Sequence, residues 1–129
     1  MPGGAASYAE VTIANGASLS GVADLTSHRL VGIVIPSAWT AANLTFQGRP
    51  KASADVTAHP NDALANVYDQ GGAEVTVTVG GASRFIALTP ATSALFDGIG
   101  ELKVRSGTSG AAVNQGAARV ITLVLIPIT

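Results

Sequence analysis

Short runs of β-branched and aliphatic residues, each closed by glycine or proline, most constrain the fold of this 129-residue chain. Apolar and polar side chains alternate along four of these runs, which are residues 8–13, 42–47, 74–79 and 102–105. Successive side chains of a strand point to opposite faces, so this alternation is typical of strands that bury one face. Helical periodicity is missing from the sequence, although residues 90–96 could form a single helical turn. The sequence therefore predicts an all-β fold.

Two further segments, residues 30–35 and 120–126, are apolar at nearly every position. Strands of this kind either lie in the centre of a structure, with both faces filled by its own core, or have an outer face that another chain covers. Only 12% of the residues are charged, and the mean hydropathy is +0.40. The longest apolar stretch falls well short of the roughly 20 residues that a transmembrane helix needs. We therefore expect a surface that partner chains cover in part, and no membrane partner.

Glycine and proline mark the turns between the runs. Asn15-Gly16 suits a type I′ hairpin, in which both central residues need positive φ, and Gly71-Gly72 and Gly80-Gly81 predict further turns. Pro36 and Pro90 fall at strand ends, where a missing N–H does little harm. About eight or nine strands result. We predict a single antiparallel β-sandwich that is jelly-roll-like.

The sandwich is expected to span residues 8–129 as one domain, because a chain of this length can bury about two thirds of its unfolded surface. The Gly/Ala-rich residues 1–7 are predicted to form a flexible arm. They lack the basic and apolar regions of a secretory signal, so we expect synthesis in a cytoplasm. Residues 48–65 make the longest polar connection. They are predicted to form an exposed loop of the kind that carries contacts with partners.

The composition argues against several classes of function. Cysteine is absent, which removes disulfides and thiolate chemistry. Seven Lys+Arg against eight Asp+Glu give a net charge of -1, which leaves no basic field for nucleic acid. His28 and His59 lie in different connections, and we interpret them as solvated loop residues rather than a general base or zinc ligands. We expect no enzymatic activity, no cofactor and no metal site.

The remaining candidates for chemistry have simpler interpretations. Single aspartates are scattered over the predicted loops without the spacing of a calcium-binding loop. They are Asp24, Asp55, Asp62, Asp69 and Asp97. Gly98-Ile99-Gly100 lacks the third glycine and the following helix of a phosphate cradle. Residues 105–110 are interpreted as a strand end with a flexible Gly/Ser turn rather than an anion-binding loop.

Four residues are candidates for contact with a partner, namely Arg49, Lys51, His59 and Trp39. The first three belong to the long polar loop. Trp39 follows an apolar run at the entrance to a loop. Its indole could stack on a sugar ring, as in many lectin-type sandwiches, or plug one end of an alanine-rich core as the largest apolar group available.

An ordered set of segments carries a family resemblance from about residue 13 onward. The segments are Leu30-Val31-Gly32-Ile33, Pro36-Ser37-Ala38-Trp39-Thr40, Leu44-Thr45-Phe46-Gln47, Tyr68-Asp69 with Gly72, Arg84-Phe85-Ile86-Ala87-Leu88 and Leu102-Lys103-Val104-Arg105-Ser106-Gly107-Thr108. The set resembles a group of small proteins that occur among the structural genes of tailed bacteriophages and prophages. None of these segments is a chemical signature. The loop at residues 48–65 departs from the pattern, since related chains pass there through a shorter Ser-x-Asp-Gly-like turn.

The resemblance implies a virion component and does not distinguish head from tail. Small β-sandwich capsid decoration (cement) proteins are one kind, and they bind the outer shell and stabilise it. A protein of this kind is localised on the capsid surface, and its partners are the major capsid protein and copies of itself, with a homotrimer as the expected oligomer. The alternative is a carbohydrate-binding β-sandwich module of a phage tail or fibre, in which Trp39 and the long loop touch host glycan.

Overall fold

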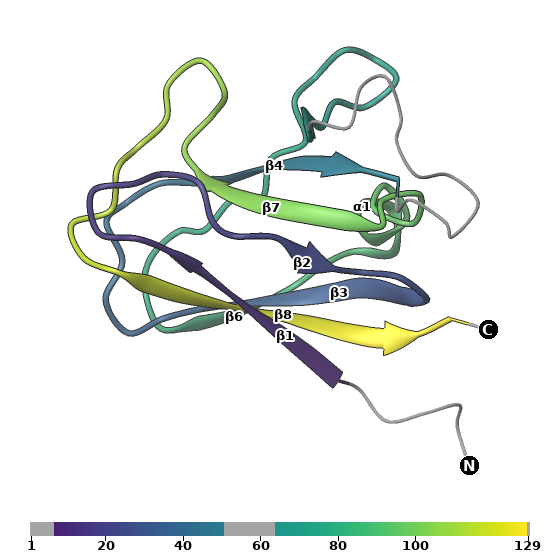
Figure 1. Cartoon of the computed structure of the whole chain (residues 1–129), viewed down its shortest axis with the longest axis horizontal. Coiled ribbons are helices and arrows are strands. Elements are labelled where there is room, and N and C mark those ends of the chain that lie inside the picture. Colours follow the sequence, from purple (N-terminus) through teal and green to yellow (C-terminus); the bar gives the residue numbers. More distant parts are fainter. Residues whose placement is uncertain (1–6, 51–63, 129) are drawn as a thin grey trace.

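The computed structural model describes residues 7–50 and 64–128, and these form eight strands and one short helix (Figure 1). The strands are β1 (Ser7–Ile13), β2 (Ala23–Asp24), β3 (His28–Ile35), β4 (Leu44–Arg49), β5 (Ala65–Asn66), β6 (Arg84–Ala87), β7 (Glu101–Ser106) and β8 (Arg119–Pro127). Sheet A has the order β1-β8-β3-β6, and sheet B has the order β2-β7-β4-β5. All pairings are antiparallel, so the predicted all-β sandwich is confirmed.

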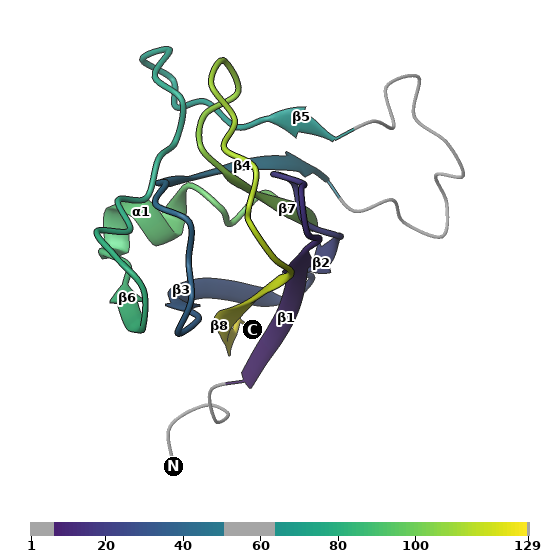
Figure 2. The same cartoon turned by 90° about the vertical axis from the view of Figure 1, so that its left-hand side faces the viewer.

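The strand pairings follow the jelly-roll scheme. β1 pairs with β8, β2 with β7, β3 with β6 and β4 with β5, as in one long hairpin that has been rolled up. Two more pairings, β3 with β8 and β4 with β7, complete the sheets. The two sheets form separate layers, with sheet A at the bottom of both views and sheet B above it (Figures 1 and 2).

The core lies between the inner faces of the sheets, where the alternation predicts it. Its fully or almost fully buried members include Val11, Ile13, Leu30, Ile33, Ile35, Leu44, Phe46, Leu102, Val104, Ile121, Leu123 and Leu125. The short helix α1 (Pro90–Ala94) begins after Thr89, whose hydroxyl accepts a hydrogen bond from the N–H of Thr92. It leads to Phe96, whose ring meets that of Phe46 edge to face, with a centroid distance of 4.9 Å.

The two segments that are apolar on both faces become β3 and β8, the inner strands of sheet A. The two predicted alternatives therefore do not exclude each other. Both strands are central in their sheet by hydrogen bonding, and their inner faces fill the core. Their outer faces, however, stay uncovered by any element among the described residues, since Val120 is 44% exposed and Ile126 is 36% exposed.

The strands β4 and β7 were each predicted to expose one face to solvent, but part of that face is buried. Thr45 in β4 and Arg105 in β7 were expected on the polar, exposed side, but Thr45 is fully buried and Arg105 is 7% exposed. Residues 74–79 supply part of the reason. Their valines are buried as the alternation predicts, but they form isolated bridges with β4 and with Tyr68 instead of a regular strand. This segment therefore continues sheet B beside β4 with its valines in the core, and Glu74 at its start reaches the guanidinium of Arg105.

The prediction of a type I′ turn at Asn15-Gly16 is wrong. Gly16 has a φ of 78°, but Asn15 has no positive φ, so one of the two required conformations is missing. The first pairing after the turn joins Ile13 to Ser20, which leaves a longer loop than a two-residue hairpin allows. The glycine thus serves a turn of another type.

Two predicted segments fall partly outside the described residues. β1 starts at Ser7, so the sandwich begins one residue earlier than expected, and residues 1–6 are not described. Lys51 and His59 lie outside the described residues as well, and the predictions for them stay open. No helix in the described ranges is long and apolar enough to cross a membrane.

Candidate interaction surface

The outer face of sheet A is an open, mostly apolar surface. Strand register sets its rows, because residues paired across an antiparallel sheet point to the same side. One row contains Tyr8, Val124, Gly32 and Ala87, and the next contains Glu10, Thr122, Val34 and Phe85. Thr12 lies beside Val120, and Ile126 lies beside Arg29. We call this surface the A face, and its side chains are those of Tyr8, Glu10, Thr12, Val34, Phe85, Ala87, Val120, Thr122, Val124 and Ile126.

Large apolar side chains on the A face are well exposed. Tyr8 on edge strand β1 is 69% exposed, and Phe85 on edge strand β6 is 61% exposed. Val120 and Ile126 on β8 are 44% and 36% exposed. Scattered apolar residues on a surface are ordinary, but a contiguous apolar patch of several hundred Å² usually marks an interaction site. The A face therefore has the chemistry of a contact surface.

A glycine in the middle of β3 shapes the A face. A Cβ atom at Gly32 would lie 2.7 Å from Cε1 of Phe85, so the aromatic ring lies directly on the glycine backbone. Glycine is found inside strands where another group approaches the backbone closely. The Phe85 ring thus occupies the space over Gly32 that a side chain would fill, and Phe85 remains largely exposed to solvent.

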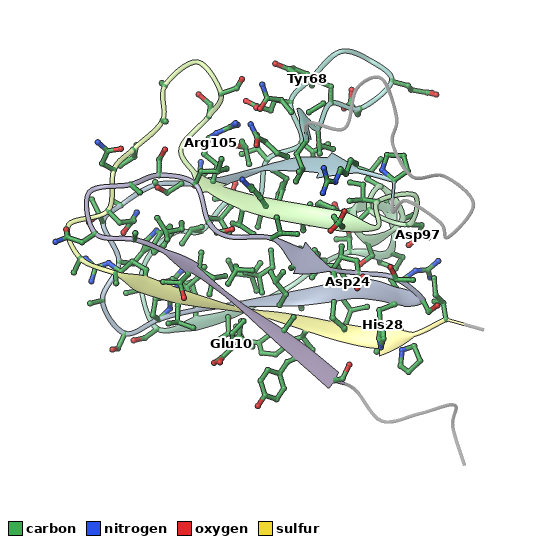
Figure 3. All side chains as sticks on the ribbon, in the orientation of Figure 1. Glu10, Asp24, His28, Tyr68, Asp97 and Arg105 are labelled. Atoms are coloured by element: carbon green, nitrogen blue, oxygen red, sulfur yellow. The ribbon has the colours of Figure 1, made fainter. Side chains whose placement is uncertain are left out.

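Charge is almost absent from the A face. Glu10 lies in the middle of β1 and points away from sheet B (Figure 3). At one margin, Arg29 forms a bidentate ion pair with Asp97, with distances of 2.6 Å and 3.1 Å. The hydrogen bond and the charge of Asp97 raise the pKa of Arg29 above its ordinary value, so the guanidinium stays charged over any accessible pH.

On the outer side of sheet B, Arg105 is buried in a polar cluster that joins two loops (Figure 3). The guanidinium donates to the carbonyl oxygen of the Asn66 side chain at 2.6 Å and to the Thr45 hydroxyl at 3.3 Å, and it lies 3.4 Å from a carboxylate oxygen of Glu74. The backbone N–H of Ser109 donates to the same carboxylate. A buried charge needs such partners, and here all of them are supplied by the chain itself.

The cluster fixes two hairpin loops, residues 68–74 and 107–112, beside each other. In the first, the Asp69 carboxylate accepts hydrogen bonds from the backbone N–H groups of Gly71 and Ala73. The hydroxyls of Tyr68 and Ser109 lie 3.4 Å apart and join the two loops. The second loop was predicted to be a flexible Gly/Ser turn, but these contacts tie it to its neighbour. Sequence reasoning missed the connection because Glu74 and Arg105 are far apart in the chain.

Trp39 lies half-buried at one end of the sandwich, where it packs against the core. Its indole N–H donates to the carbonyl oxygen of Ala42 at 3.1 Å. Next to it, Gln115 is 1% exposed and forms two hydrogen bonds with the backbone of Thr40, at 2.8 Å and 3.0 Å. Of the two interpretations of Trp39, the core plug agrees with these contacts. A sugar-stacking role would need an indole face free for the ligand.

Replacing Trp39 by alanine is expected to lower the free energy of unfolding by about 2 kcal/mol, less than the cost at a fully buried site, because the ring is only partly covered. Trp39→Phe keeps most of the packing and removes the indole hydrogen bond, so about 1 kcal/mol should be lost. Urea unfolding measures both. If Trp39→Ala left the stability unchanged and abolished sugar binding instead, the core-plug interpretation would be wrong.

Arg49 is placed at the end of β4, where its Nε donates to the Glu101 carboxylate at 2.8 Å. It borders an open groove of about 280 Å³ whose other walls include Tyr68, Leu95 and Ile99. The structure thus brings Arg49 together with the hairpin residue Tyr68 and does not bring it near Trp39, which lies at the entrance to another loop. The two sequence candidates among the described residues, Arg49 and Trp39, therefore do not share one site.

Histidine and carboxylate chemistry find no assembled site in the part of the chain that the structure describes. His28 is the first residue of β3, not a loop residue, and its Nδ1 lies 2.8 Å from the carbonyl oxygen of Thr26. No group of three or more His, Asp or Glu side chains within the described ranges could hold a metal ion.

No family model, no curated protein and no solved structure matches this chain.

Proposed function

We propose that this protein is a non-enzymatic structural protein of a tailed-phage virion, and more specifically a decoration protein that binds the outer shell of the capsid and stabilises it. The A face is the observation that supports this proposal. An apolar, almost uncharged sheet face with exposed aromatic side chains at both edges suits a protein whose work is to assemble. The resemblance of the sequence to phage structural proteins supplies the kind of assembly.

The apolar composition of the A face makes its burial in an assembly energetically favourable. Covering apolar surface is favourable by roughly 25 cal/mol for each Å², before the costs of association are subtracted. Permanent interfaces are more hydrophobic than transient ones, and they resemble a core cut in half. The A face has that composition, because valine, isoleucine and aromatic side chains dominate it.

A decoration protein also needs polar contacts with the shell, and the paired hairpin loops at residues 68–74 and 107–112 suit that need. They present tyrosine, serine and glycine in a fixed arrangement, and their buried charges are already paired. Preorganised loops of this composition are typical of surfaces that recognise folded proteins, because little ordering is left to do on binding. The proposal therefore uses two different surfaces of the sandwich.

Addition of the purified chain to preformed capsids that lack it tests the proposal. We expect binding at a fixed number of copies per capsid, together with a higher temperature of capsid disruption, because a bound protein stabilises the state that it binds. Capsids of an unrelated phage serve as the control and should neither bind the chain nor gain heat resistance. A complete failure to bind the matching capsids would overturn the proposal.

A further inference from the structure

We infer that the A face packs against the A face of a second copy of this chain, across a two-fold axis between the two sheets. The inference rests on the proposed function, because it takes the A face as an assembly surface, and it adds the partner. It predicts a dimer, whereas the sequence resemblance implies a homotrimer.

Charge limits what can cover the A face. Glu10 is the one carboxylate of the surface, and it lies on an edge strand. Arg29 lies at the margin and is already bound to Asp97. A charged or strongly polar partner would lose water without gaining pairs. The partner surface must be apolar and nearly uncharged, and the A face of another copy has that chemistry.

Symmetry favours a pair over a ring. A ring of three copies uses two different surfaces of each chain, so it needs a second apolar surface that fits the first. Of the other exposed large apolar side chains of the described residues, Val22 precedes β2 and Ile128 follows β8. Tyr68 and Leu95 lie in the open groove that Arg49 borders, so a second surface built on them would be hollow and lie beside a charged side chain, unlike the A face. One self-complementary surface is what a two-fold dimer requires.

The rows of the A face fit each other across such an axis. If the axis runs parallel to the strands, β1 of one copy lies over β6 of the other. Tyr8 at one end of its row then faces Ala87 at the other end of the same row. The largest side chain of the row therefore meets the small side chain of an alanine, which suits close packing between two sheets about 10 Å apart. In the next row Glu10 faces Phe85, so the one carboxylate of the surface lies against an aromatic ring.

The area of the A face is close to what a stable dimer needs. An aromatic side chain can bury about 150–250 Å², and Tyr8 and Phe85 each leave well over half of theirs free, at 69% and 61%. Together with the aliphatic side chains of β8 and β3, these residues offer roughly 500 Å² of apolar surface. A standard interface buries roughly 800 Å² per partner, so the apolar part alone supplies more than half of it. Glu10, Thr12 and Thr122 add polar area to the remainder.

Sedimentation velocity of the full chain over a range of concentrations tests the inference with three single variants. Tyr8→Ser is expected to weaken dimerisation at least roughly tenfold, because it removes a large apolar side chain from the interface. Tyr68→Ser is the matched control, since Tyr68 is similarly exposed at 53% but lies outside the A face, and it should leave the dimer unchanged. Glu10→Gln is expected to strengthen dimerisation roughly three- to tenfold, because an uncharged side chain is easier to bury.

The opposite directions of Tyr8→Ser and Glu10→Gln protect the test against simple misfolding, since a damaged fold does not associate more tightly. A chain that is monomeric at every concentration, a trimer, or a dimer that neither A-face variant changes would overturn the inference. The proposed function fails separately. A dimer that does not bind capsids would sink the decoration role alone, and a capsid-binding monomer or trimer would sink the dimer alone.

Discussion

Replacing Arg105 by methionine is expected to lower the free energy of unfolding by about 3 kcal/mol, because removal of one partner leaves a carboxylate buried without its counter-charge. The side chains of Arg105 and Glu74 are only 9% and 13% exposed, so water cannot replace the lost contact. Methionine keeps most of the aliphatic volume over β7 and removes the guanidinium. Asn66 and Thr45 lose a donor in the same step. Guanidinium chloride unfolding, with its slope checked for two-state behaviour, measures the change.

The double variant Arg105→Met with Glu74→Gln is the control for this experiment. It removes both charges, so much of the lost stability should return, since a buried ion pair often contributes little once both partners are replaced. The backbone N–H of Ser109 keeps an acceptor in the glutamine side chain. If the double variant proved no more stable than Arg105→Met alone, the loss would come from packing and not from the unpaired carboxylate.

Replacing Phe46 by alanine is expected to have the largest effect on stability, a loss of about 4 kcal/mol. Phe46 is fully buried, and its ring meets Phe96 edge to face, so the substitution leaves a cavity between sheet B and the segment that follows α1. Phe46→Leu fills part of that space and should lose about 1–2 kcal/mol. Thermal unfolding followed by calorimetry separates the two variants, and equal losses would show that cavity volume does not set the cost.

Much of the fold follows from local patterns in the sequence. The alternating runs at residues 8–13, 42–47 and 102–105 locate β1, β4 and β7, and the two apolar runs locate β3 and β8. These patterns work because side-chain direction has a period of two in every strand, whatever the strand pairs with. The number of strands and the turn spacing favour a sandwich, but local patterns do not determine the strand order that makes it a jelly roll.

Local patterns could not predict which residues are buried by a segment that is distant in the sequence. Arg105 alternates with apolar neighbours in the way that a solvent-exposed residue does, yet a hairpin from another part of the chain buries it. Gln115 carries no local signal of burial either, although it is 1% exposed and its side chain hydrogen-bonds to the backbone of Thr40, next to Trp39. A polar residue in an alternating pattern is exposed only if nothing distant in sequence lies on that face.

The candidate residues of the polar loop and the open surface of sheet A belong to different parts of the sandwich. Arg49 lies at the end of β4, whereas Lys51 and His59 lie outside the described residues. The apolar character of residues 30–35 and 120–126 did indicate the open surface. Tyr8 and Phe85 were missed because each belongs to a different edge strand, and only the register brings them to the margins of one face.

The place of β8 in the sheet also determines when this protein can mature during synthesis. β8 lies between β1 and β3, and it is the partner with which β1 forms its ladder in sheet A. In a nascent chain that still lacks β8, β1 has no partner strand in sheet A. Contacts so distant in sequence form slowly. β8 also supplies Val120, Val124 and Ile126 to the A face. A chain without β8 therefore lacks both the strand that joins β1 to β3 and three apolar side chains from the middle of the A face.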